Sequence, residues 1–166
     1  MKKTSTKSPC LNLGGVADRK TALLAWCAYA GKHGELKGLL QYVYHYFYFQ
    51  KLNDYESANS VLTIAKSRCK RFDALCEILL QKGVNPVFSK EIPPGAKCDF
   101  SWDLSRKKAK RKIILDDLSF EMVSVKEYEK MASVCENVQL KKLFEKFVLD
   151  GQLHIKTLKN RFCSLK

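Results

Sequence analysis

The strongest constraint on the fold of this 166-residue chain is a repeated spacing of apolar residues, at alternating steps of four and three, along four long stretches. Apolar side chains at these steps lie along one side of an α-helix. No alternation of apolar and polar residues, which is typical of a strand, competes with this pattern in the sequence. We therefore predict four helices over residues 19–51, 54–82, 105–137 and 138–165.

The connections between the predicted helices are short, long and short. Tight junctions fall around residues 52–54 and 136–137, whereas residues 84–104 form a long connection that contains three prolines. This order is typical of two antiparallel hairpins joined by a crossover. At a rise of about 1.5 Å per residue, each helix spans roughly 40 Å. The sequence therefore predicts an elongated all-α four-helix bundle over residues 19–166, after a flexible basic segment over residues 1–18.

A polar residue interrupts the apolar stripe of each predicted helix near its middle. These residues are Glu35, Arg68, Glu121 and His154, and Arg71 lies one turn after the first arginine. The middles of all four helices share one layer in an antiparallel bundle, so these side chains are expected to meet. A lone buried charge costs several kcal/mol, whereas converging polar groups can satisfy one another. The alternative is that some of them lie at the edge of the stripe and reach water.

The order of several short motifs resembles that of the ferritin-like superfamily, in particular its bacterial branch of rubrerythrin-like and manganese-catalase-like proteins. The resemblance covers about residues 22 to 160 and consists of many weak matches in the right order. It implies a ferritin-like four-helix bundle and a bacterial protein. The matching positions are Tyr29-Ala30-Gly31, Gly34-Glu35-Leu36, Gln41-Tyr42, Ile64-Ala65, Leu79-Leu80-Gln81-Lys82-Gly83, Asn85-Pro86, Trp102, Glu121, Tyr128-Glu129, Val148-Leu149-Asp150 and His154-Ile155.

The resemblance also implies a site for two metal ions in the middle of the bundle. In that superfamily, each hairpin supplies one Glu from one helix and a Glu-x-x-His motif from the other. Carboxylate and imidazole ligands suit iron or manganese. Three of the six positions keep a residue type that binds metal, and two arginines and a glycine stand at the others. Carried over to this chain, the six positions are Glu35, Arg68, Arg71, Glu121, Gly151 and His154.

The two arginines argue against a metal ion at these positions. A guanidinium stays protonated and cannot coordinate a cation. Glu35 and Glu121 supply two negative charges, and Arg68 and Arg71 supply two positive ones, so the charges balance. A planar guanidinium also matches a carboxylate in bidentate fashion. We therefore predict internal ion pairs in place of the metals, with no cofactor expected. The protein is then a degenerate ferritin-like pseudo-enzyme with a structural or binding role.

Two other functions stay open. One is a di-iron or dimanganese oxidoreductase or metal-binding protein that uses Glu35, Glu121 and His154. The other is a basic helical protein that binds nucleic acid or another polyanion, since the formal net charge is +13. Basic residues are spread along the chain, however, as on the solvated faces of any Lys-rich bundle. The candidate patch, which also fits a solvated helix entrance, comprises Arg106, Lys107, Lys108, Lys110, Arg111 and Lys112.

Aromatic residues surround the end of the first predicted helix, at Tyr42, Tyr44, Tyr46, Phe47, Tyr48 and Phe49. This band is too wide for one core stripe. It indicates either burial beneath the crossover, which contains Phe88, Phe100 and Trp102, or contact with a second chain. We expect a homodimer or another protein partner.

Seven cysteines occur without a CxxC pair, which fits neither a zinc site nor a disulfide framework. They are expected to be small buried hydrophobes in a reducing compartment.

No run of 18 apolar residues predicts a membrane span, and residues 1–9 lack the features of a secretory signal. We therefore expect a cytoplasmic protein without a membrane partner. His33 and His45 match no ligand position and are expected at the surface or at the edge of the core stripe.

Overall fold

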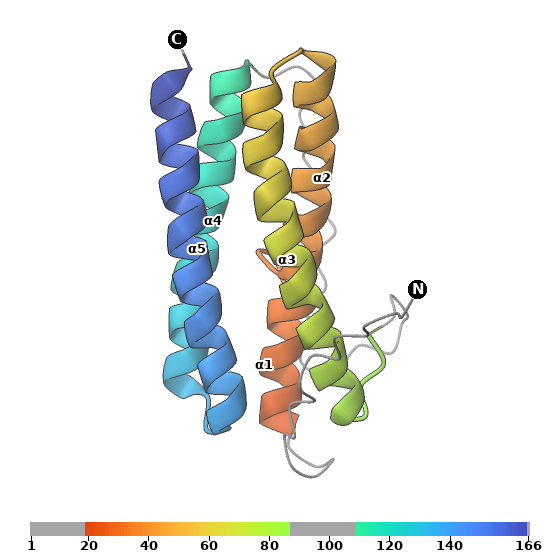
Figure 1. Cartoon of the computed structure of the whole chain (residues 1–166). Helices are drawn as coiled ribbons and strands as arrows, with labels where there is room; N and C mark the ends of the chain where they lie inside the picture. The colour runs from red at the N-terminus through yellow and green to blue at the C-terminus, as the bar shows by residue number, and fades with distance from the viewer. Residues whose placement is uncertain (1–18, 87–108, 166) are drawn as a thin grey trace, which may run out of the picture.

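The computed structural model describes residues 19–86 and 109–165. These residues form five helices, α1 (Arg19–Ala30), α2 (Glu35–Lys51), α3 (Tyr55–Gln81), α4 (Lys110–Val134) and α5 (Val138–Ser164). Helices α1 and α2 follow one another along one side of an elongated bundle, where they take the place of one long helix (Figure 1). Helix α2 pairs with α3, and α4 pairs with α5.

The predicted all-α four-helix bundle is confirmed. Helix α3 ends and α4 begins at opposite ends of the bundle, as two antiparallel hairpins joined by a crossover require (Figure 1). Most of that connection, residues 87–108, lies outside the described residues, as do residues 1–18. The bounds of α3 and α5 differ from the predicted ones by one residue at most.

The single helix predicted over residues 19–51 is wrong, because the chain breaks between α1 and α2. The Gly31 N–H donates to the Cys27 carbonyl at 3.0 Å and ends the first helix. A Cβ atom on Gly34 would lie 2.9 Å from the carbonyl oxygen of Ala28, so only glycine fits this turn. The chain then restarts as a helix at Glu35, which places a helix N-terminus at mid-height of the bundle.

The predicted helix over residues 105–137 is also too long at its C-terminal end. Helix α4 stops at Val134 because Cys135 has extended backbone angles, φ −81° and ψ 118°. Asn137 then begins the next helix, since its side-chain oxygen accepts hydrogen bonds from two backbone N–H groups of α5 at 3.1 and 3.0 Å. Residues 105–108 lie outside the described part of the chain.

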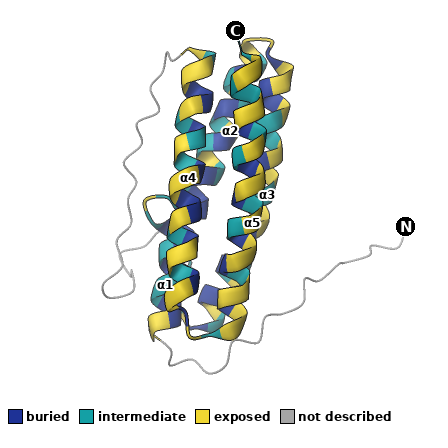
Figure 2. Ribbon diagram, turned by 90° about the vertical axis from the view of Figure 1, so that its left-hand side faces the viewer, coloured by how far each residue is buried: buried dark blue, intermediate teal, exposed yellow. Residues whose placement is uncertain are grey.

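The apolar core is divided into two clusters along the bundle. One cluster lies where α1 packs, around Trp26 and Phe144, and the other lies where α2 packs, around Phe49 and Leu158. The buried faces of the helices point inward over the whole length of the bundle (Figure 2). Between the two apolar clusters lies a layer of buried polar side chains, and this layer is the candidate functional site.

None of the described helices is long and apolar enough to cross a membrane. The expectation that the cysteines are buried is correct for Cys135 and wrong for Cys69 and Cys163, which are exposed on the outer sides of α3 and α5. Cys27 and Cys76 are half-buried. Cys69 and Cys163 lie outside the apolar stripes of their helices. The expectation that cysteines are buried considers only the residue type and not this position, and it is therefore wrong for these two.

Candidate functional site

Arg68 lies at the centre of the polar layer and joins two carboxylates from different helices. Its side chain on α3 is fully buried. Nη1 donates to Glu35 Oε2 at 3.1 Å, and Nε and Nη2 donate to Glu121 Oε1 at 3.0 and 2.8 Å. The guanidinium plane also lies over the rings of Phe120 and Tyr42, at 5.0 and 5.7 Å from their centroids. One buried cation therefore links α2, α3 and α4.

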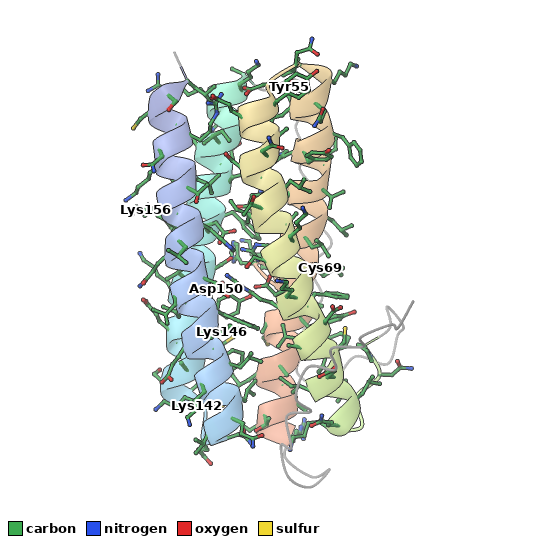
Figure 3. All side chains as sticks on the ribbon, in the orientation of Figure 1. Tyr55, Cys69, Lys142, Lys146, Asp150 and Lys156 are labelled. Carbon is green, nitrogen blue, oxygen red and sulfur yellow. The ribbon has the colours of Figure 1, made fainter. Side chains whose placement is uncertain are left out.

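Arg71, one turn further along α3, supplies the second positive charge. Its Nη1 donates to Glu35 Oε1 at 3.2 Å, and its Nε lies 3.7 Å from Asp150 Oδ2. Asp150 lies on α5 at mid-height of the bundle and is about one-third exposed (Figure 3). The guanidinium packs 5.2 Å from the centroid of the Phe147 ring. This arginine therefore connects the buried layer to the outer side of α5.

A tyrosine and a histidine also contact the carboxylates of the two glutamates. Tyr128 OH donates to Glu35 Oε1 at 2.5 Å, and His154 Nδ1 lies 3.2 Å from Glu121 Oε2. All four carboxylate oxygens in the layer thus have a partner. Ser124 completes it, since its hydroxyl accepts from Arg68 Nη2 at 3.3 Å and donates to the His33 carbonyl at 3.2 Å. Sequence reasoning had not assigned a role to the tyrosine hydroxyl or to this serine.

The electrostatics of the layer favour ionised carboxylate and guanidinium. Burial alone raises the pKa of Glu121, but the positive charge of Arg68 and the hydrogen bond from His154 outweigh it and bring the pKa down to about 2. Burial has the opposite effect on Arg68 and lowers its pKa. The charges of the two carboxylates outweigh this effect and raise the pKa well above its ordinary value. Burial and the charge of Glu35 raise the pKa of Tyr128, which keeps its hydroxyl a donor.

Two glycines near this layer lie directly against side chains from neighbouring helices. A Cβ atom on Gly38 would lie 2.6–2.8 Å from the guanidinium of Arg68, so the guanidinium lies against the bare backbone of α2. A Cβ atom on Gly151 would lie 2.5 Å from Cγ2 of Val125. A longer side chain at either position therefore requires its neighbours to move.

A second buried polar cluster lies between α2 and α4, one turn from the first. Asp117 is fully buried, and its two oxygens accept from Gln41 Nε2 at 2.6 Å and lie 2.9 Å from His45 Nδ1. Burial raises the pKa of Asp117, while the hydrogen bond to His45 acts in the opposite direction. His45 is buried rather than at the surface, and His33 is half-buried with its Nδ1 2.8 Å from Glu127 Oε1. The spacing of four residues between Asp117 and Glu121 was the available signal for this cluster.

The basic patch predicted over residues 106–112 is described only in part. Lys110 lies 3.4 Å from Asp54 Oδ2, and Lys112 lies 2.8 Å from Asp116 Oδ1. The Arg111 guanidinium lies 4.3 Å from the centroid of the Phe162 ring. Arg106, Lys107 and Lys108 lie outside the described residues. The three described cations therefore have intramolecular partners, and the polyanion function stays a prediction.

The donor set does not fit a metal ion. Among the described residues, no group of three or more His, Cys, Asp or Glu side chains could hold one. Glu35, Glu121 and His154 lie in one layer, but each is bonded to another side chain of that layer. Two permanently protonated guanidiniums stand where the resemblance implies metal ligands, and they would repel a divalent cation.

Comparison with known proteins supports the fold. No protein-family model matches the chain, and no curated protein matches its sequence. Among solved structures, the chain is similar to the bacterioferritin of Desulfovibrio desulfuricans, with a TM-score of 0.71 and 21% sequence identity over 90% of this chain and 83% of the other. That bacterioferritin has a diiron site, seen in different catalytic states. The likeness shows a ferritin-like fold for this chain.

Proposed function

We propose that this chain is a ferritin-like protein whose two-metal site has been replaced by a network of buried ion pairs, and that it acts without a metal, as a structural or binding protein. The observation that supports this most directly is the position of Arg68. Its guanidinium lies between the carboxylates of Glu35 and Glu121 and bonds to both. A metal bound by the same two carboxylates would have to displace a cation that is already there.

The charge balance of the layer supports the same proposal. The two glutamates and the two arginines sum to zero, so the centre needs no external cation for neutrality. A centre of four carboxylates would need divalent ions to offset its charge, but here arginine stands at one Glu position and glycine at another. The glycine position has no room for a glutamate while Val125 keeps its present conformation. We derive no redox or transfer step through this centre.

The experiment that tests the proposal is metal analysis of the full chain. The protein is purified from cells grown with added iron and with added manganese, and its metal content is measured by plasma mass spectrometry. We expect far less than one metal ion per chain in both preparations. An Arg68→Glu, Arg71→His variant, purified in parallel, serves as a comparison because it restores two ligand types. One or more ions per wild-type chain would overturn the proposal and support the alternative site of Glu35, Glu121 and His154.

The polyanion function is tested separately by nucleic-acid binding. Patch residues that contact phosphates should give binding that weakens steeply as salt is added. Neutralising Arg106, Lys107 and Lys108 together should abolish that binding and its salt dependence. Binding that is unchanged by these substitutions would exclude the patch as the contact surface.

A further inference from the structure

Helix α5 exposes two large apolar side chains on the side that faces away from the core. Leu149 and Leu153 are 62% and 63% exposed. The helix packs against α3 and α4 and runs along most of the length of the bundle (Figure 1). Its buried stripe, which includes Phe147 and His154, faces the core. The two leucines therefore lie on the side of α5 that the described bundle leaves open to solvent.

Lysines flank these leucines in both directions along the helix. Lys142 and Lys146 precede them and Lys156 follows them along α5 (Figure 3). All five lysines of the helix are exposed, and none of them forms an ion pair with another described residue. At about 1.5 Å per residue, the row extends over roughly 27 Å and has an apolar centre. The whole set is Lys141, Lys142, Lys146, Lys156 and Lys159.

Few negative charges offset this row. Asp150 lies 3.7 Å from Arg71, and Glu145 is the other acidic residue of α5. Five exposed lysines and one exposed glutamate leave a net charge of +4 on the open surface of the helix. Lys142 and Lys146 are one turn apart, and like charges at that spacing destabilise a helix. The stability of α5 therefore does not explain why these lysines are there.

The row consists of lysine, whereas arginine makes specific contacts inside the bundle. Arg68 and Arg71 bind carboxylates of the polar layer. Arg161, which also belongs to α5, donates to Asp54 Oδ1 at 2.9 Å. The planar fork of a guanidinium suits a partner of fixed geometry, but an ammonium on a flexible stem also suits charges that move. The lysine row therefore fits a partner with a diffuse negative surface.

The leucines distinguish between the possible anionic partners. A nucleic acid presents rows of phosphates without an apolar layer beneath them, so Leu149 and Leu153 would stay exposed against it. An anionic lipid bilayer has negative headgroups directly above apolar chains. Lysine stems can lie along that boundary with their ammonium groups among the phosphates, while leucines reach the chains. A lipid surface therefore matches both the charge and the apolar centre of the row.

We propose that the outer side of α5 binds the surface of an anionic lipid membrane, peripherally and without crossing it. The sequence-based expectation of no membrane partner depends on the lack of a spanning segment and of a secretory signal, and a peripheral contact requires neither. The inference names a partner for the binding role proposed above and rests on that role. It does not involve the polar layer, so the two proposals can be tested separately.

Sedimentation of the full chain with lipid vesicles tests the proposal. Vesicles of pure phosphatidylcholine are compared with vesicles that contain about 30% phosphatidylserine, at roughly 0.15 M salt. We expect the wild type to bind the anionic vesicles about tenfold or more tightly. Lys142→Glu with Lys146→Glu should weaken this binding about tenfold or more, because each lysine near an anionic surface contributes roughly a fivefold factor. Leu149→Ser with Leu153→Ser should weaken it about fivefold, because the charge stays but the apolar contact is lost.

Two control variants change other faces of the bundle. Lys66→Glu with Lys70→Glu on the exposed side of α3 makes the same change in net charge at the same spacing of four residues. Phe47→Ser removes a ring that is 64% exposed on α2, on the far side of the bundle from α5 (Figure 1). Both should change vesicle binding by less than about twofold, since screening limits the reach of distant charges to roughly 8 Å. Circular dichroism verifies that the helices of each variant are intact.

Three outcomes would overturn the proposal. The first is a wild type that does not prefer the anionic vesicles. The second is an equal loss of binding in the α5 and α3 charge variants, which would indicate attraction through the dispersed charge of +13. The third is a leucine variant that binds as the wild type does, which would indicate contact through charge alone, as with a nucleic acid. Metal content is measured on the same samples: a chain that holds metal contradicts the metal-free proposal alone, and metal-free protein whose vesicle binding does not depend on α5 contradicts this inference alone.

Discussion

At the scale of single residues, the polar layer depends on mutual satisfaction rather than on any one bond. Arg68 is fully buried and has two carboxylate partners, and each carboxylate has at least one further donor. Burying such ions costs several kcal/mol each, and their attraction compensates only while every partner is present. The layer is therefore much more sensitive to the loss of one member than its modest net contribution to stability suggests.

Replacing Glu35 with Gln should lower the free energy of unfolding by about 3–5 kcal/mol, since Arg68 and Arg71 would both lose an anionic partner inside the core. Chemical denaturation monitored by circular dichroism measures the change. Glu129→Gln on the exposed side of α4 is the control and should change stability by less than about 0.5 kcal/mol. Equal stabilities of the two variants would show that the network does not hold the centre together.

Acid should remove the contribution of Glu121 to the stability of the fold over a defined pH range. Its pKa is 4.5 in the unfolded chain and about 2 in the folded one. Its ionised form therefore stabilises the fold above pH 4.5, and this stabilisation is lost as the pH falls from 4.5 toward 2. The difference in pKa corresponds to roughly 3 kcal/mol. In Glu121→Gln, unfolding free energy plotted against pH should be flatter over that range than in the wild type, and Glu129→Gln should follow the wild type.

At the scale of helices, glycines decide where polar groups can lie. Gly31 and Gly34 break the first helix, which makes Glu35 the first residue of α2, where the helix dipole favours a carboxylate. The apolar spacing of residues 19–51 continues across this break, so periodicity predicts one helix and misses the turn. Gly38 and Gly151 lie inside helices for a different reason. At each position, the absence of a side chain leaves room for a side chain from another helix.

Replacing Gly151 with Ala should destabilise the protein, although alanine is about 1 kcal/mol better than glycine inside an ordinary helix. The new Cβ atom would lie 2.5 Å from Cγ2 of Val125. We expect a net loss of about 1–3 kcal/mol, typical of overpacking. Adding Val125→Ala removes that clash, so the double variant should be more stable than the sum of the single effects predicts. Additive effects in thermal unfolding would contradict this account.

At the scale of the whole molecule, the antiparallel arrangement determines which residues meet. Glu35, Arg68, Glu121 and His154 stand near the middle of their predicted helices, and the sequence alone is enough to expect them in one layer. The spacing of residues cannot predict which hydrogen bonds these side chains form, because the bonds depend on the rotation of each helix about its axis by a few tens of degrees. Asp117 shows this limit: it precedes Glu121 by only one turn but points toward α2, where it meets His45.

Charge balance also predicts what restoring the implied ligand set would require. Substituting Arg68→Glu, Arg71→His and Gly151→Glu gives four carboxylates and two imidazoles, and Val125→Ala is needed to make room beside position 151. Without metal, four buried carboxylates repel one another, so this variant should be less stable than the wild type.

Manganese at about 100 times its dissociation constant should then raise the melting temperature of this variant by roughly 5–10 °C, because only the folded state holds the ligands together. The wild-type melting temperature should not respond, since its own guanidiniums already neutralise the centre. The same variant without Val125→Ala should respond less, because the clash at position 151 remains. Calorimetric scans with and without manganese measure all three proteins, and a wild type stabilised as strongly as the variant would show that the arginines leave the centre open to cations.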